Sequence, residues 1–258
     1  MIAFPLLSLW DKKALVFNFS LIGVKLRYKG TYLGFLWNVL EPILTFLILY
    51  VVFTSIRERS GDFGIYLLTG IVMYHVFARG TLNGLASFHN NKNFIITLNI
   101  NREFYPAIAV GSVTLTTLVE VAVLFALFPF FQFTPDITAL LIFLPVLLIL
   151  LLVLGLTYLL SVISVFLKDI QPLWAVIVHV IFFISPIFWY VKDVDGILLD
   201  ILKINPVGQI IELTHHIVVF GQIPPLNDWL NTLAIVLGIL FFGFFVFKKY
   251  QNKIAEEL

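Results

Sequence analysis

The sequence predicts an all-α integral membrane protein with six transmembrane helices. Of its 258 residues, 60% are hydrophobic and only 12% are charged, and the mean hydropathy is +1.03. A soluble domain of this size could not cover so much apolar surface with polar groups. The few charges cluster between long apolar runs, so the net charge of +1 indicates no nucleic-acid partner. We therefore expect one transmembrane domain over residues 1–258.

The first apolar run follows a basic collar. Lys25, Arg27 and Lys29 precede about two dozen mostly apolar residues, and such a collar is typical of the cytoplasmic end of a span. Residues 8–24 contain too short an apolar run to cross a bilayer, and we expect an amphipathic helix on the inner membrane surface there. The N-terminus shows no cleavable signal pattern, so we expect the first span to direct insertion.

Six apolar runs are near or above the roughly twenty helical residues that a hydrocarbon core requires. They cover residues 32–55, 64–86, 104–131, 138–166, 172–190 and 229–247. The third and fourth are longer than needed and should tilt, kink at Pro145 in the fourth, or project beyond the lipid. Two apolar pieces within 191–228 are each too short to span, which predicts outer re-entrant or interfacial helices between spans five and six.

The basic residues set the orientation. Eleven lysines and arginines fall in the inner segments of this topology, against four in the outer ones, Arg57, Arg59, Lys192 and Lys203. The positive-inside rule therefore places both termini in the cytoplasm.

Ionisable residues within spans are costly and mark candidate sites. Glu41 and Arg79 lie at a similar depth, roughly 13 Å from the inner ends of neighbouring antiparallel spans, which predicts an ion pair between them. The pair could be structural or could open during a transport cycle. Pro42, directly after Glu41, should kink the first span. Glu120 lies nearer the outer leaflet, and the sequence shows no obvious partner for it.

Several kinds of site are not expected in this chain. There is no cysteine, which excludes disulfides and thiolate metal sites. His75 and His179 lack the spacing of metal ligands, and the adjacent His215 and His216 point about 100° apart on a helix. No Gly-Lys dipeptide is present, so no Walker-type phosphate loop exists. We expect no catalytic, cofactor-binding or metal-binding residue, and any ATP must be bound by another chain.

The inner connection at residues 87–103 is longer than a turn. Its asparagine-rich rim surrounds Phe94 and Ile95, and two interpretations stay open: a short helix presented to a cytoplasmic partner, or a solvated loop. The candidate contact residues are Asn91, Lys92, Phe94 and Ile95.

Four segments carry a family resemblance. They are KLRYKGTYLGFLWNVLEPIL at 25–44, VFLKDIQPLW at 165–174, SPIFW at 185–189 and the Asn-Pro pair at 205–206. Over nearly its full length the chain resembles the membrane (permease) subunit of bacterial ATP-binding-cassette (ABC) exporters of polysaccharide, which carry O-antigen, capsule or teichoic-acid chains.

The resemblance implies a homodimer in the bacterial inner membrane with separate ATPase subunits that bind ATP and magnesium. It implies a lipid-pyrophosphate-linked glycan as cargo, moving through a path at the dimer interface. The loop at 87–103 would then rest on the ATPase as a coupling helix, and residues 192–226 would gate the exit. The family leads us to expect an arginine soon after Asn205-Pro206, where this chain has His215 and His216 instead.

The resemblance also suggests roles for two residue groups. Lys25, Arg27 and Lys29 could attract the pyrophosphate at the inner leaflet, although they serve equally well as topology determinants and anionic-lipid contacts. Aromatic faces stack on sugar rings without fixed polar partners, so some span aromatics could line a path instead of facing lipid. These candidates are Phe35, Trp37, Tyr74, Phe77, Phe125 and Phe128.

Three rival functions remain at this point. A permease of the same architecture could export a drug or lipid. An ion-coupled secondary transporter is disfavoured by the lack of an inverted repeat and of paired mid-membrane acids. A membrane-embedded enzyme is disfavoured by the lack of a catalytic constellation.

Overall fold

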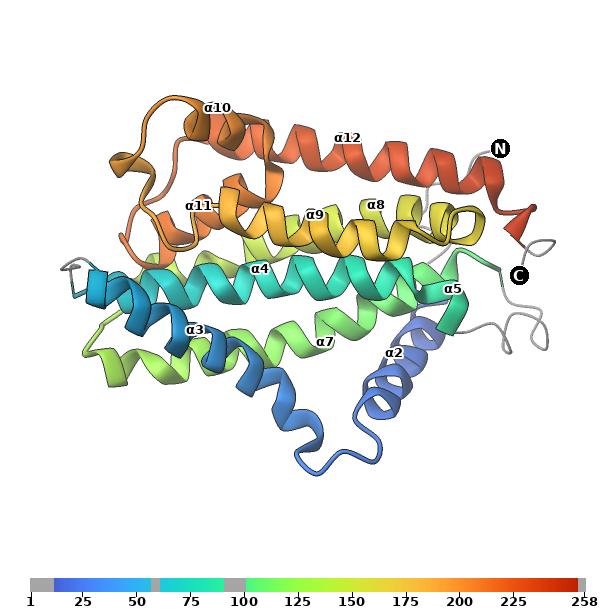
Figure 1. Cartoon of the computed structure of the whole chain (residues 1–258), viewed down its shortest axis with the longest axis horizontal. Coiled ribbons are helices and arrows are strands. Elements are labelled where there is room, and N and C mark those ends of the chain that lie inside the picture. Colours follow the sequence, from blue (N-terminus) through green and yellow to red (C-terminus); the bar gives the residue numbers. More distant parts are fainter. Residues whose placement is uncertain (1–11, 57–60, 91–100, 255–258) are drawn as a thin grey trace.

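The computed structural model describes residues 12–56, 61–90 and 101–254, and every regular element in these ranges is a helix. Long helices run side by side along the longest axis of the protein, with shorter helices at both ends (Figure 1). The all-α prediction is confirmed for this part of the chain.

Five candidate membrane spans occur in the described ranges. They are η1 (Gly34–Leu36) with α3 (Trp37–Ile56), α4 (Phe63–Leu85), α7 (Phe104–Leu127) with η2 (Phe128–Phe131), η3 (Ile137–Ile142) with α8 (Phe143–Phe166), and α12 (Leu226–Tyr250). Their limits lie within three residues of the predicted runs, because long apolar segments are a strong signal. Pro145 falls in the first turn of α8, where it removes no hydrogen bond within the α-helix.

The fifth predicted run, 172–190, forms a shorter helix. α9 (Ile170–Ile184) has 15 residues and ends where Ser185 adopts an extended conformation before Pro186. A residue that precedes proline disfavours the helical region, which explains the early end. At 1.5 Å per residue, α9 is about 22 Å long, less than the roughly 30 Å of a hydrocarbon core.

Three short elements follow α9: η4 (Val191–Asp193), α10 (Ile197–Ile204) and α11 (Pro206–Val218). Asn205 separates the last two. Its side-chain oxygen accepts a hydrogen bond from Val207 N at 3.1 Å, and its Nδ2 donates to Ser185 Oγ at 3.0 Å. The sequence Asn-Pro therefore starts α11 with a capping side chain and a proline at N1, and anchors it to the end of α9.

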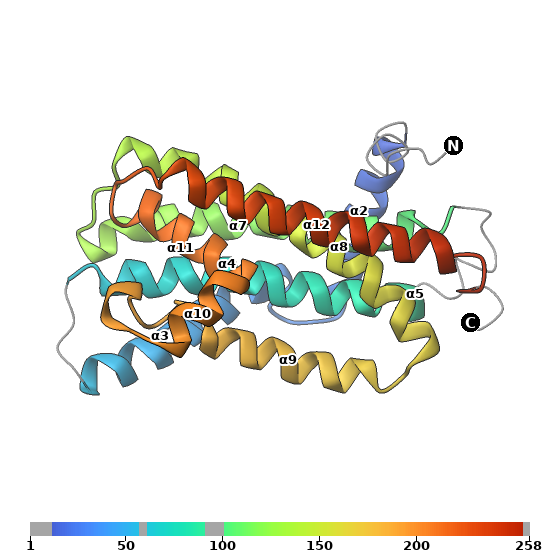
Figure 2. The same cartoon turned by 90° about the horizontal axis from the view of Figure 1, so that it is seen from above.

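α4 lies at the centre of the bundle (Figures 1 and 2). In its most apolar stretch 83% of the residues are buried, against 17% for the span that contains α3. Gly80 and Gly84 let α4 approach α8, since a Cβ at either would lie 2.4 Å from Val153 or 2.2 Å from Thr157. Gly30 and Gly34 have positive φ in the turn before α3, a conformation that favours glycine.

α8 and α12 also approach each other closely at glycine residues. A Cβ on Gly243 would lie 2.0 Å from the carbonyl oxygen of Gly155, and a Cβ on Gly155 would lie 2.6 Å from Leu240 Cα. Two helices can come this close only where both carry glycine at the crossing.

Gly243→Ala is expected to lower the free energy of unfolding by about 1–3 kcal/mol, because the added methyl group would overlap the α8 backbone. Gly238→Ala on the same helix should be neutral or stabilising, since nothing lies within 4 Å of its added Cβ. Thermal unfolding of both variants in one detergent measures the difference. Equal melting temperatures would contradict the close crossing.

Candidate functional site

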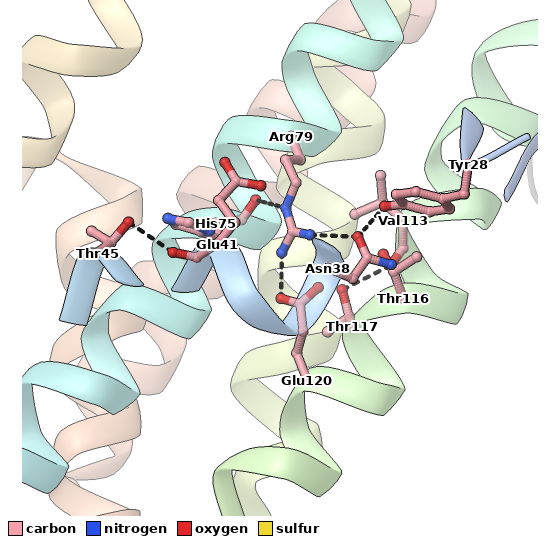
Figure 3. Close-up of polar contacts among 10 residues, drawn as sticks. All are labelled: Tyr28, Asn38, Glu41, Thr45, His75, Arg79, Val113, Thr116, Thr117 and Glu120. Atoms are coloured by element: carbon pink, nitrogen blue, oxygen red, sulfur yellow. Dashed lines mark hydrogen bonds and ion pairs between the residues drawn. The ribbon is translucent and has the colours of Figure 1, made fainter. Parts of the chain in front are cut away.

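A buried ion pair joins α4 to α7 (Figure 3). Arg79 Nη2 pairs with Glu120 Oε2, and the two side chains are only 15% and 1% exposed. Arg79 Nε also donates to the carbonyl oxygen of His75 on its own helix at 3.4 Å. A charge in such surroundings is tolerated only when a partner neutralises it. Each of the two residues therefore supplies the counter-charge that the other needs.

Asn38 connects this pair to α3 and to α2 (Lys13–Arg27). Its Oδ1 accepts hydrogen bonds from Arg79 Nη1 at 2.9 Å and from the hydroxyl of Tyr28, which follows α2. Asn38 is 1% exposed. Burial raises the pKa of Tyr28, so its phenol keeps the proton that it donates. One polar network thus holds four segments: the end of α2, α3, α4 and α7.

The predicted ion pair between Glu41 and Arg79 is wrong. No ion pair joins them within the described residues, and Glu41 is exposed on α3. The inward stripe of this helix consists of Asn38, Pro42 and Phe46, spaced four residues apart, and Glu41 lies beside it. Pro42 stays within a continuous α3.

The directions of the side chains explain the error. A helical side chain points back toward the N-terminus of its own helix. Because α4 runs antiparallel to α3 and α7, Arg79 reaches toward the later part of α7, where Glu120 lies and points back toward it. Glu41 points in the same direction as Glu120 but starts at the height of Arg79, so it points away from the guanidinium group. Depth alone therefore led to the wrong carboxylate. Side chains that start at equal heights on antiparallel helices point away from each other, so the equal heights of Glu41 and Arg79 disfavour their pairing.

Further polar groups are buried beside the ion pair. Glu120 Oε1 and His75 Nδ1 have no hydrogen-bond partner among the described residues, and Thr116 and Thr117 each donate to the backbone of α7. No group of three metal-ligating side chains occurs in the described part of the chain. The cluster can hold charge and fix helix positions.

The six aromatic candidates fall into two groups. Tyr74, Phe77 and Phe128 are 6% exposed or less, and the Tyr74 hydroxyl donates to Val178 O at 2.6 Å on α9. Phe125 is partly buried against the same core. For the three buried residues a lining role is contradicted, since they fill the interior of the subunit. Phe35 and Trp37 are 39% and 44% exposed at the start of the first span.

The basic residues before the first span lie within the described residues, whereas the candidate coupling residues do not. Lys25, Arg27 and Lys29 are exposed, and the first two end α2. The coupling candidates Asn91, Lys92, Phe94 and Ile95 lie outside the described residues. So do residues 8–11 of the predicted interfacial helix, whose remainder forms most of α2 and packs on α7 through Ser20 and Ser112.

Two buried contacts were not expected from the sequence. One lies at the start of α7 and the other in α11. Glu103, 3% exposed, pairs with Lys248 and so ties the start of α7 to the end of α12. His215 is fully buried, stacks on Tyr66 with ring centroids 3.6 Å apart and contacts its carbonyl oxygen at 3.0 Å. His179 Nδ1 lies 2.7 Å from Ala175 O, one turn earlier on α9. Sequence spacing gave no signal for the first two contacts, because they join distant segments.

A comparison with known protein families shows to which family the chain belongs. The family model described as "ABC-2 type transporter" matches residues 21–219. The chain belongs to the ABC-2 type transporter family. The match includes α4 and α7, and so the helices that carry Arg79 and Glu120.

Relatives within this family resemble the chain from end to end. An O-antigen export system permease protein, RfbA, of Klebsiella pneumoniae is 24% identical over 91% of both chains, and one of Myxococcus xanthus is 21% identical over 97% of this chain and 98% of its own. The polysialic acid transport protein KpsM of Escherichia coli is 23% identical over 89% of this chain and 90% of its own. The resemblance to polysaccharide-export permeases is confirmed.

Glu120→Ala is expected to destabilise the protein by about 3–5 kcal/mol, because it leaves Arg79 buried without a counter-charge. Glu41→Ala is the matched control and should have a much smaller effect. Replacing both Arg79 and Glu120 by methionine should recover part of the loss, since an apolar pair can substitute for a buried ion pair. Thermal unfolding compares the variants, and a Glu41→Ala loss as large as that of Glu120→Ala would refute the assignment.

Proposed function

We propose that this chain is the membrane subunit of an ATP-driven exporter that moves a lipid-pyrophosphate-linked polysaccharide, of the O-antigen type or a related glycan, across the bacterial inner membrane. The carrying observation is the end-to-end similarity to permeases named for O-antigen export. The apolar spans and the absence of a Walker motif in the sequence fit a subunit that relies on another chain for ATP.

The proposed topology has six spans with both termini in the cytoplasm. α9 would be the fifth span, completed beyond its helical part by residues 185–190. The distribution of lysine and arginine supports the orientation. α10 and α11, with 8 and 13 residues, are too short to cross a bilayer and would form the outer re-entrant pair.

The proposed subunit interface is the side of the bundle formed by α3 and α9, which lie along the same side in Figure 2. Large apolar side chains are exposed on both helices, among them Ile48, Val51, Val176 and Val180. The exposed polar residues Glu41 and His179 interrupt this surface. Lipid would penalise such groups, which supports contact with a second copy and a polar path there. Phe35 and Trp37 remain candidates for the wall of that path.

The coupling surface and the cargo contact complete the proposal. The segment with Asn91, Lys92, Phe94 and Ile95 would contact the ATPase and pass its movement to the spans. Lys25, Arg27 and Lys29 would attract the pyrophosphate at the inner leaflet, where their exposure leaves them accessible.

The first test is purification of the tagged full-length chain from its native membrane. We expect an ATPase subunit to co-purify in equal amount, and its ATP hydrolysis to rise when a lipid-linked glycan is added. Replacing Phe94 and Ile95 by serine should release the ATPase and leave the chain in the membrane. Purification of the chain without any nucleotide-binding subunit would overturn the proposal.

The second test uses the natural absence of cysteine in the sequence. A single cysteine at Val180 should form a disulfide-linked dimer in oxidised membranes, because this exposed position on α9 lies on the proposed subunit interface. The control is a cysteine at Leu147, which is equally exposed but lies on α8. Non-reducing electrophoresis measures the linked fraction. Equal linkage at both positions, or none at Val180, would contradict this interface.

A further inference from the structure

An open cleft of about 660 Å³ lies between α10, α11 and the first turns of α12. Figure 1 places α12, which forms one wall of the cleft, along the opposite edge of the protein from α3. Its lining is mixed. The polar residues are Lys203, Gln209, Glu212, His216, Asp228, Asn231 and Thr232, and the apolar ones are Val191, Leu199, Leu202, Leu213, Ala234 and Ile235.

Gln209 fixes the three helices that form the cleft. Its Nε2 donates to the carbonyl oxygens of Leu202 and Lys203 at 3.3 and 2.6 Å, at the end of α10. Its Oε1 accepts from Thr232 Oγ1 on α12 at 3.0 Å. Both ends of this amide are therefore occupied by the protein, and the cleft is held open by specific contacts and not by loose packing.

Other polar groups remain available to a ligand. The Asp228 and Asn231 side chains are exposed and accept or donate no hydrogen bond among the described residues, although the Asp228 carboxylate lies near enough to His216 to favour its protonated form. Lys203 pairs with Asp200 at 2.8 Å, but both side chains are more than 70% exposed, and such a pair is weak. His216 lies 3.5 Å from Glu212, and this contact raises the pKa of His216. The cleft thus offers the Asp228 carboxylate, the Lys203 ammonium group and the His216 imidazole to a ligand.

The polar and apolar linings lie at different depths. α12 has 25 residues and is about 37 Å long, against roughly 30 Å of hydrocarbon, so its first turn reaches the level of the lipid head groups. Asp228 lies in that turn, whereas Ala234 and Ile235 lie about 10 Å deeper. The cleft therefore runs from the head-group layer into the acyl layer, which is the shape of a site for an amphiphile.

We propose that this cleft binds one phospholipid with an amine-bearing head group, such as phosphatidylethanolamine. The ammonium group binds the Asp228 carboxylate and the Asn231 amide oxygen, the phosphate faces His216 and Lys203, and an acyl chain lies along Ala234 and Ile235. No described residue that lines the cleft is aromatic, so a stacking platform for sugar rings is missing and a lipid is favoured over the exported glycan. The proposal rests on the proposed function only for the leaflet, which is the outer one.

Native mass spectrometry of the purified full-length chain tests the site, with phosphatidylethanolamine and phosphatidylglycerol added separately. We expect phosphatidylethanolamine to be retained about tenfold more tightly. Asp228→Asn should weaken its retention about tenfold, since a hydrogen bond to a charged group is lost. Asp195→Asn, which removes an exposed carboxylate outside the cleft, should leave retention unchanged.

A second pair of variants changes volume and not charge. Ala234→Phe should fill the deeper part of the cleft and weaken retention of the lipid, while Gly238→Phe, one turn further along α12 and outside the cleft, should not. Equal retention of phosphatidylethanolamine by the wild type and Asp228→Asn, or equal retention of the two lipids by the wild type, would overturn the proposal. Because these experiments measure lipid retention, their outcome does not depend on whether the chain exports polysaccharide.

Discussion

The need to neutralise Arg79 constrains the helices around it. A guanidinium group cannot lose its charge inside a protein, and in this bundle its neighbours are mostly apolar. Glu120 supplies the counter-charge from α7, and Asn38 supplies a second acceptor from α3. Because Arg79 lies on the central helix α4, these contacts fix the positions of α3 and α7 against it. The hydroxyl of Tyr28 extends the same network to the end of α2. A movement of α3 would therefore have to break or replace the Asn38 contact.

Small residues determine the packing on the other side of α4, where the helices lie close together. Gly80 and Gly84 lie against Val153 and Thr157 of α8, and Gly155 of α8 lies against α12. Close helix contact in a membrane depends on packing, since lipid is as apolar as the side chains. α4, α8 and α12 thus form a closely packed unit, whereas only 17% of the apolar stretch that contains α3 is buried. Among the five candidate spans of the described residues, α3 is the one with the least buried surface.

The sequence predicted what depends on composition along the chain, and it failed where direction around a helix matters. Hydropathy located five spans to within a few residues, because twenty apolar residues in succession have few alternative structures. It overestimated α9, because an apolar run continues through Ser185-Pro186 although the helix does not. It could not choose between Glu41 and Glu120 as the partner of Arg79, since depth does not give the direction in which a side chain points. For the same reason, aromatic content could not separate buried Phe77 from exposed Trp37.

The polar residues left on the surface support the proposed contact with a second copy of the chain. Glu120 and Arg79 neutralise each other's charge within the chain. Glu41 and His179, in contrast, are exposed on α3 and α9, on a side of the bundle that is otherwise apolar. In lipid, such groups would be penalised without any gain in packing. A second copy placed against this side would bury the apolar residues and leave the polar ones along a shared path. The same surface would then serve both assembly and transport, which explains why polar groups persist there.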